Sequence, residues 1–366
     1  MKLHFQQTDL AESVNIVLKA VPSKTTMPIL ECILIDASAS EIRFTANDME
    51  LGIETIVKGT IEERGKIALD AKIFSDIVRK LPNSVVTIET DVRDVASITC
   101  ERAKFEIPGK DAEEFAALPM IDKNDHISLS QFSLREVIRQ TIFSLAPNEN
   151  NKLMTGELFE IRNGVLKVVS LDGHRISIRN LELKEYCPDK KVVVPGKTLN
   201  EISKILSGEM DDEVQIYFDY NYVLFEFGST IVLSRLIDGE YFRIDQMISS
   251  DYETKVVLNR QAFIGSIDRA TLLVRENDKM PVVLDIRDDF MDLQINTVLG
   301  SMDEEAAVEK TGKDIVIGFN PKFLLDALRV IEDEEVSLYF INAKAPCFIR
   351  DDEGNYIYLI LPVNIR

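Results

Sequence analysis

Two sets of three basic residues recur in this chain at a constant interval of 125 residues, so that the chain holds three pairs with one member from each set. In chain order they are Lys72, Arg79, Lys197, Lys204, Lys322 and Arg329. Within each pair the second residue follows seven positions after the first, which is about two turns of an α-helix, so both side chains would share one helix face. Rows of Lys and Arg are the groups that bind nucleic-acid phosphates. The pattern therefore favours a polyanion-binding surface, and the alternative is a solvated face on each helix.

The segment Asp172-Gly173-His174-Arg175 is a second candidate for chemistry. An aspartate and a histidine could serve as acid and base in a hydrolase. No nucleophile motif lies beside them, the three histidines are scattered, and the four cysteines form no CxxC pair. The other interpretation of this segment is a plain hairpin turn. We expect no catalytic residue, no metal site and no cofactor, and a hydrolase remains the minor alternative.

The basic residues lie in a segment that occurs three times, as DAKIFSDIVRKLP, PGKTLNEISKILS and NPKFLLDALRVIE. Each copy lies between two apolar, strand-like runs. The period is too long for a solenoid repeat and fits a whole small domain. The sequence therefore predicts three tandem copies of one α+β domain, each with two helices and about eight strands.

Apolar residues at helical spacing predict one further helix ahead of each repeated segment. The six expected helices cover residues 8–20, 70–81, 131–146, 196–207, 259–274 and 320–331. Alternating runs such as VLKVVSL and YVLFEF predict the strands between them. We expect domains at 1–120, 127–247 and 254–366, joined by short polar segments.

The net charge of −20 opposes binding to a polyanion, so the distribution of charge decides the question. The six expected helices hold twelve basic and eight acidic residues, a net charge of +4, which leaves −24 on the rest of the chain. The chain shows no signal-peptide pattern and no apolar run of the ~18 residues that a membrane span needs. Unpaired cysteines suggest reduced thiols, so we expect a cytoplasmic protein.

Helix dimensions limit how such a surface could surround a duplex. Helices pack ~8–10 Å apart, so six in a circle span ~17 Å between axes. Subtracting ~10 Å for helix thickness leaves no room for DNA, which is roughly 20 Å wide. Twelve helices leave ~24 Å by the same packing rule. Two chains would therefore enclose a duplex, and one chain would not.

In order along the chain stand TMPILECILI, TANDMELGIE, SLDGHRISI, VVVPGKTLNEI, SRLIDGEY, GFNPKFLLDAL and YLILPVNIR. With these motifs the chain resembles the bacterial DNA polymerase III beta subunit, the sliding-clamp family, over essentially its whole length. The resemblance implies three copies of a two-helix, two-sheet domain and a head-to-tail homodimeric ring around double-stranded DNA. It implies a non-enzymatic processivity factor whose partners are the replicative polymerase, a clamp loader and other proteins with a clamp-binding motif. A scaffold of three repeats without a DNA role is the second alternative.

The resemblance also assigns sites. It places a hydrophobic peptide-binding pocket at Met154, Leu171, Gly173, His174, Arg175, Ile176, Phe242, Met247, Leu359, Leu361, Pro362 and Val363. The expected DNA-facing residues are Lys24 and the six recurring basic residues. The expected ring interface pairs Phe105 and Ile107 with Leu272 and Leu273, for which ordinary core packing is the alternative.

This chain departs from the family pattern at two places in or beside that pocket. Phe242-Arg243 stands where a Pro-Asp pair is usual, and Asn364 stands where a basic residue is usual. We expect the first departure to make the pocket wall bulkier and the second to remove a polar contact.

Overall fold

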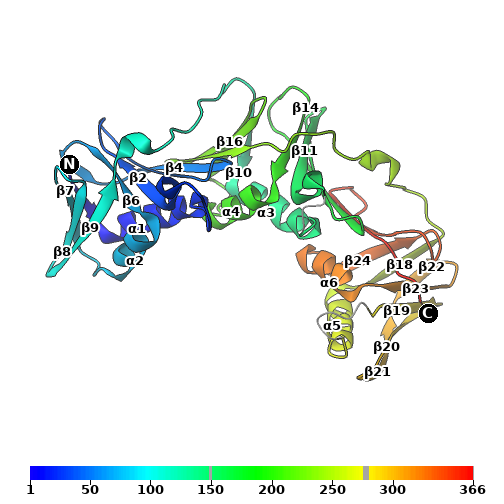
Figure 1. Cartoon of the computed structure of the whole chain (residues 1–366). Helices are drawn as coiled ribbons and strands as arrows, with labels where there is room; N and C mark the ends of the chain where they lie inside the picture. Colours follow the sequence, from blue (N-terminus) through cyan, green and yellow to red (C-terminus); the bar gives the residue numbers. More distant parts are fainter. Residues whose placement is uncertain (148–150, 275–279, 366) are drawn as a thin grey trace. The chain divides into compact units, whose positions relative to one another are not determined.

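The computed structural model describes residues 1–147, 151–274 and 280–365. Its α-helices confirm the six expected from the sequence (Figure 1). They are α1 (Gln7–Val17), α2 (Ala71–Lys80), α3 (Gln131–Thr141), α4 (Gly196–Ile205), α5 (Arg260–Thr271) and α6 (Pro321–Val330). α1 packs against α2, and α5 packs against α6. No helix in these residues is long and apolar enough to cross a membrane.

Local side chains fix where the helices begin and end. Asp70, Asn259 and Asn320 each cap a helix by accepting a hydrogen bond from a backbone N–H in its first turn. α3 ends five residues before the expected limit because the chain tightens into a 3₁₀ turn at Ile142–Ser144. The hydroxyl of Thr141 also donates back to the carbonyl of Val137.

The strands of the described residues form three antiparallel sheets. The first has the order β10 (His126–Ser130), β15 (Glu213–Phe218), β16 (Tyr222–Phe227), β17 (Thr230–Arg235), β4 (Leu51–Val57), β3 (Ile42–Asn47), β2 (Cys32–Asp36), β6 (Lys66–Asp70), β9 (Ala103–Lys110), β8 (Val95–Cys100), β7 (Val85–Thr90), β1 (Lys2–Gln6) and β5 (Thr60–Glu63). The second has the order β14 (Lys190–Pro195), β11 (Gly156–Arg162), β12 (Val165–Leu171), β13 (Arg175–Glu182), β26 (Tyr356–Ile360), β25 (Cys347–Arg350), β24 (Glu335–Phe340), β18 (Thr254–Asn259) and β22 (Glu309–Gly312). The third has the order β21 (Gly300–Ala307), β20 (Phe290–Thr297), β19 (Val282–Arg287) and β23 (Ile315–Phe319).

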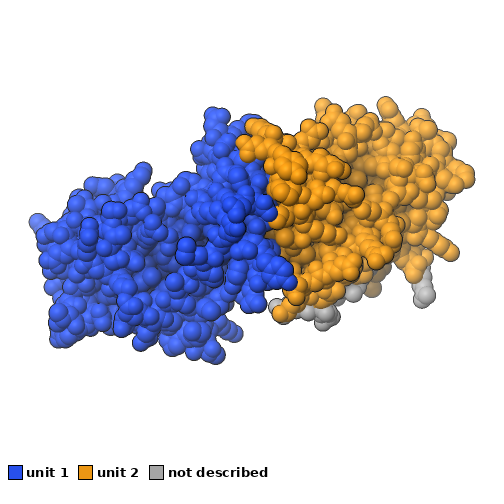
Figure 2. All heavy atoms as spheres, turned by 90° about the horizontal axis from the view of Figure 1, so that it is seen from above, with its two compact units in different colours: residues 1–134, 201–236 blue, residues 135–200, 237–366 orange. Residues whose placement is uncertain are grey.

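Two ladders cross the expected domain joints. β17 pairs with β4 through Thr230–Ser234, and β13 pairs with β26 through Arg175–Arg179. The chain accordingly divides into two compact units, residues 1–134 with 201–236 and residues 135–200 with 237–366 (Figure 2). These units do not coincide with the expected domains, because each ladder fuses part of the central domain with a neighbour. The domain limits stay a prediction.

Alternating apolar residues supply the cores. In the first unit Phe5, Phe44 and Phe74 make successive ring contacts at 6.0 and 6.2 Å. In the second unit the side chains of α5, α6 and β18–β20 form one large cluster. The four cysteines are buried, and none of them forms a disulfide bond.

Candidate functional site

The recurring basic residues lie on exposed helix positions, but most are already paired. Arg79 bonds Asp76 on its own helix, and Lys204 bonds Glu201 at 2.7 Å. Within the described residues no carboxylate lies in ion-pair range of Lys72 or of Lys24, both of which are exposed. The basic faces therefore carry less free charge than a count of lysines and arginines suggests.

The third copy of the pattern is paired as well. Lys322 bonds Asp326 at 2.7 Å within α6, and Arg329 bonds Asp268 of α5 at 2.8 Å. Lys197, the remaining member, is exposed on α4.

The acidic partners recur with the same period, which the sequence interpretation missed. Asp76, Glu201 and Asp326 are 125 residues apart. Each follows four positions after the recurring lysine of its own helix. The full repeated pattern is therefore basic, acidic, basic on one helix face. Such pairs are worth only about 0.3–0.5 kcal/mol each on an exposed helix, so phosphates can compete for the basic groups.

The predicted pocket residues converge on one apolar cluster. Leu171, Ile176 and Leu359 are buried in it, and Met154 and Phe242 pack against it from the partly exposed side. Phe242 meets Tyr241 edge-on with ring centroids 5.5 Å apart. Five residues from four chain segments are thus brought together, as a groove for apolar anchors requires.

The C-terminal segment lies beside this cluster. The N–H of Leu361 donates to the carbonyl of His174 at 2.9 Å, and that of Val363 donates to Gly318 at the same distance. Leu361 and Val363 stay 38% and 37% exposed. Met247 is 48% exposed, and its N–H donates to the carbonyl of Ile244, a residue of the cluster. Exposed apolar side chains around a buried apolar floor form a surface that a partner peptide can cover.

Arg175, one of the expected pocket residues, is buried and bonded within the fold. Its side chain is only 7% exposed, and Nη1 lies 2.7 Å from Asp326 of α6 while Nε lies 3.1 Å from Asp172. The guanidinium also lies over the ring of Phe323, 4.5 Å from its centroid. A guanidinium held by two carboxylates and a ring is a structural tether between β13 and α6. His174, by contrast, is exposed, and its ring stacks on that of Phe323.

A buried acid lies on β11, the strand that contributes Leu158 to the same cluster. Glu157 has no solvent exposure, and neither carboxyl oxygen has a hydrogen-bond partner in the described structure. Burial raises the pKa of Glu157 well above its ordinary 4.5. Burial therefore favours the neutral form of the carboxyl group in the folded protein.

We predict that Glu157→Met stabilises the protein increasingly as pH rises. The folded wild type holds a proton that the unfolded chain releases above pH ~4.5, so its stability falls as pH rises toward the folded pKa, by at most about 1.4 kcal/mol per pH unit. Methionine has a similar length and no charge to bury. Urea unfolding of both proteins at pH 5, 7 and 9 checks this, and a constant stability difference across the three values would contradict it.

Two strand edges stand open near the expected interface residues. β9 pairs with β8 along Ala103–Pro108 but reaches β6 only at Gly109 and Lys110. β21 pairs with β20 alone among the described strands. Open edges are templates for pairing with another chain.

The four expected interface residues differ in exposure. Leu272 is 78% exposed and Phe105 is 39% exposed, whereas Ile107 is only 8% exposed and belongs to the core of its own unit. Leu273 packs partly against the core of the second unit. The core alternative, which concerned the two leucines, therefore applies in part to Leu273 and not to Leu272. Ile107 is also a core residue, and Phe105 and Leu272 remain exposed for contact.

Arg269 fixes the end of α5 next to β21. Its Nε lies 2.8 Å from Glu304 Oε2, and this bond, with that from Ser266, lowers the pKa of Glu304 to about 2. Leu273, two residues after α5, lies close to Gly300 at the start of β21.

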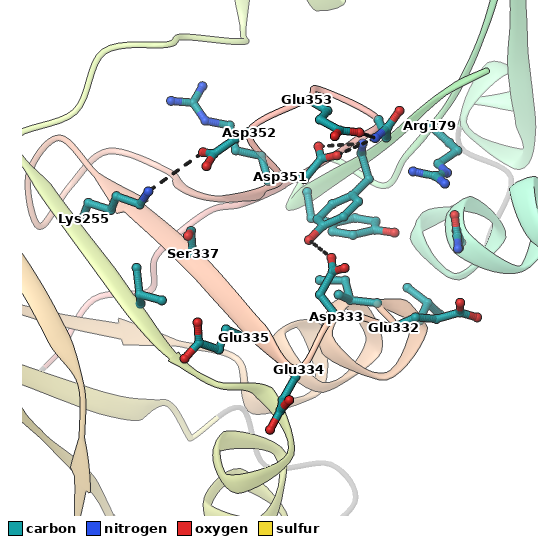
Figure 3. Close-up of a pocket in the computed structure, with 18 residues that line it drawn as sticks. Arg179, Lys255, Glu332, Asp333, Glu334, Glu335, Ser337, Asp351, Asp352 and Glu353 are labelled. Atoms are coloured by element: carbon teal, nitrogen blue, oxygen red, sulfur yellow. Dashed lines mark hydrogen bonds and ion pairs between the residues drawn. The ribbon is translucent and has the colours of Figure 1, made fainter. Parts of the chain in front are cut away.

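A cavity of about 880 Å³ lies at the other end of the β13–β26 ladder (Figure 3). Seven carboxylates line it against three basic side chains, and none of the predicted pocket residues does. Tyr356 donates to Asp333 there, and Lys255 lies 3.9 Å from Asp352. The described residues contain no acidic or His/Cys group arranged to hold a metal ion. The negative charge of this cavity repels phosphates, so the cavity does not extend the candidate DNA surface.

Comparison with known proteins gives a consistent result. Models of the N-terminal, central and C-terminal domains of the DNA polymerase III beta subunit match residues 1–119, 128–242 and 245–364. The beta sliding clamp of Bacillus subtilis is 35% identical over 378 residues, which cover 99% of each chain. The structure is similar to that of a putative DNA polymerase III beta subunit from Eubacterium rectale, with a TM-score of 0.97 and 64% identity over 100% of this chain and 99% of that one. It is also similar, with a TM-score of 0.93 and 27% identity over 100% of each chain, to a Bartonella birtlesii sliding clamp bound to griselimycin.

Proposed function

Because the chain belongs to the DNA polymerase III beta subunit family, we propose that two copies close into a ring around double-stranded DNA. Its relatives are sliding clamps, and the protein is a non-catalytic processivity factor of DNA replication. The expected fold of three tandem clamp domains is confirmed by the three consecutive family matches. The observation that carries the DNA role is the threefold recurrence of exposed basic residues on helices of an otherwise acidic chain.

The charge pairs on those helices fit sliding better than tight binding. Each basic group that bonds a neighbouring carboxylate must exchange it for a phosphate, which makes each DNA contact weak. Weak phosphate contacts carry no sequence information and depend strongly on salt. The second alternative, a scaffold without a DNA role, does not account for this recurrence.

The apolar groove is the proposed docking site for partner proteins. Short segments with aliphatic and aromatic anchors would cover Met154, Phe242 and Leu361, with His174 at the edge. Ordering such a peptide offsets much of the burial energy, so we expect micromolar affinity. The replicative polymerase, the clamp loader and other clamp-binding proteins would share this site in the bacterial cytoplasm.

The proposed ring interface joins the open edge of β9 in one copy to the open edge of β21 in the other. Phe105 and Leu272 would be buried in this contact, at about 1.5–3 kcal/mol each. Phe105→Glu with Leu272→Glu should therefore give monomers, since charges would then face an apolar contact.

Sedimentation of the double variant at micromolar concentration checks this prediction. The matched control is Tyr186→Glu with Tyr220→Glu, two exposed tyrosines outside β9, β21 and the turns beside them, which should leave the wild-type mass unchanged. A dimeric Phe105/Leu272 variant would show that the interface lies elsewhere.

A further inference from the structure

The hairpin that frames the peptide groove has a structural copy in the first unit. The β12–β13 turn at residues 172–175 and the β3–β4 turn at residues 48–51 are built alike. In each turn the first residue is an aspartate, Asp48 or Asp172. Its Oδ1 accepts hydrogen bonds from the backbone N–H groups two and three positions later, at 2.7 to 3.1 Å. In each, the next residue has a positive φ, 86° at Gly173 and 75° at Met49. Methionine rarely adopts this conformation, so its use shows that the turn geometry itself is fixed by the surroundings.

The strand beside the turn is also repeated. The N–H of Leu361, after β26, donates to His174 at 2.9 Å, and the N–H of Arg235, at the end of β17, donates to Glu50 at 2.8 Å. β17 runs antiparallel to β4 just as β26 runs antiparallel to β13. The backbone framework of the groove therefore occurs twice in the chain.

The two copies differ in the residue that directly follows the turn, at the place where an apolar side chain can pack. Ile176 follows the second turn and packs into the groove floor, whereas Gly52 stands at the equivalent place after the first turn. A Cβ on Gly52 would lie 2.3 Å from Cδ2 of Leu118. Glycine thus makes room for the Leu118 side chain, which comes from the segment after the first domain's last helical turn.

The space that Leu118 leaves is small. A cavity of about 80 Å³ remains, and Met49, Glu50, Tyr222, Leu233 and the segment 116–119 line it. Ligand pockets usually have roughly 300–1,000 Å³. Met49 nevertheless stays 53% exposed at the rim of this cavity, and Met247 beside the proposed groove is similarly exposed, at 48%. An apolar rim without an accessible floor is what remains when a pocket is filled by its own chain.

We propose that the place framed by the β3–β4 turn, β17 and the segment 116–119 is a second peptide site of the same class. The side chain of Leu118 fills this site as an internal ligand. Each chain then offers one open groove, and removing Leu118 exposes a second seat for an aliphatic or aromatic anchor. The inference rests on the proposed peptide-binding function of the first groove. Both sites lie within one unit each, so each can be followed separately.

Methionine methyl NMR distinguishes the two sites. The probe is a short peptide with one leucine and one phenylalanine anchor, titrated into the full-length protein labelled at methionine methyls. In the wild type we expect saturable shifts at Met154 and Met247 and none at Met49. In Leu118→Ala we expect Met49 to shift as well, and calorimetry should count two peptides per chain instead of one.

Three further variants complete the test. Leu118→Met keeps the seat filled and should behave like the wild type, and Leu118→Val provides a milder opening if the alanine variant folds poorly. Combining Leu118→Ala with deletion from Leu361 should leave one site, reported by Met49 alone.

The outcomes separate the two proposals. A silent Met49 in both opened variants, with Met154 and Met247 responding, overturns the second site and leaves the first. A responding Met49 in the wild type overturns closure by Leu118. Silent Met154 and Met247 in the wild type reject the proposed groove, whatever Met49 does.

Discussion

Deleting residues 361–366 should weaken binding of polymerase and loader peptides by at least about 100-fold. In the proposed groove Leu361, Pro362 and Val363 would form the wall supplied by the C-terminal segment, and two lost apolar contacts are worth about 3 kcal/mol. β26 ends at Ile360, so its ladders with β13 and β25 stay complete. Fluorescence polarisation of labelled peptides measures the loss, and the sedimentation coefficient should show that the dimer persists.

A shorter deletion provides the control. Removing residues 364–366 leaves the three wall residues in place and should keep affinity within a few-fold of the wild type. Equal affinity for all three proteins would show that the C-terminal segment is not part of the groove. Loss of binding in the short deletion would instead assign the contact to Asn364 or its neighbours.

Reversing Lys72, Lys197 and Lys322 to glutamate should reduce equilibrium binding of duplex DNA at least tenfold at 150 mM salt, and more at lower salt. Each lysine that contacts a phosphate contributes roughly 0.9 to the slope of log affinity against log salt, so the slope should fall by up to about 2.7 per chain. The fold should survive, because the three side chains are exposed and Asp326 keeps its bond to Arg175.

Net charge alone could produce a similar loss, so the control carries the same charge change elsewhere. Lys58, Lys184 and Lys344 are exposed and lie outside the helices. Their reversal to glutamate should weaken DNA binding far less, because distant exposed charges are screened within about 8 Å at physiological salt. Equal losses in both triple variants would refute a specific role for the helix faces.

The 125-residue period made the helices predictable, since it repeats the apolar spacing that fixes a helix face. It also contained a signal that was overlooked: Asp76, Glu201 and Asp326 keep the same interval and neutralise part of each basic face. Element ends were less predictable. α3 stops at Thr141 because of a hydroxyl bond and a 3₁₀ turn that apolar spacing does not encode.

Contacts between residues far apart in the chain could not be predicted from the sequence. Arg175 reads locally as an exposed turn residue, but its partner Asp326 comes from 151 positions away. Likewise nothing in the spacing of Gly52 and Leu118 shows that one makes room for the other. The family resemblance supplied the expected pocket residues, but only the folded contacts show which of them are buried, which stay exposed and which bond to distant segments.

Topological retention on DNA tests the ring most directly. The protein is loaded with clamp loader and ATP onto a nicked circular plasmid, and the complex is isolated by gel filtration in 150 mM salt. A single restriction cut should then release the protein, because a closed ring slides off a free end while its weak phosphate contacts do not hold it. Retention before the cut with release after it is the predicted result. Equal retention on circular and linear DNA, or none on either, would contradict the account.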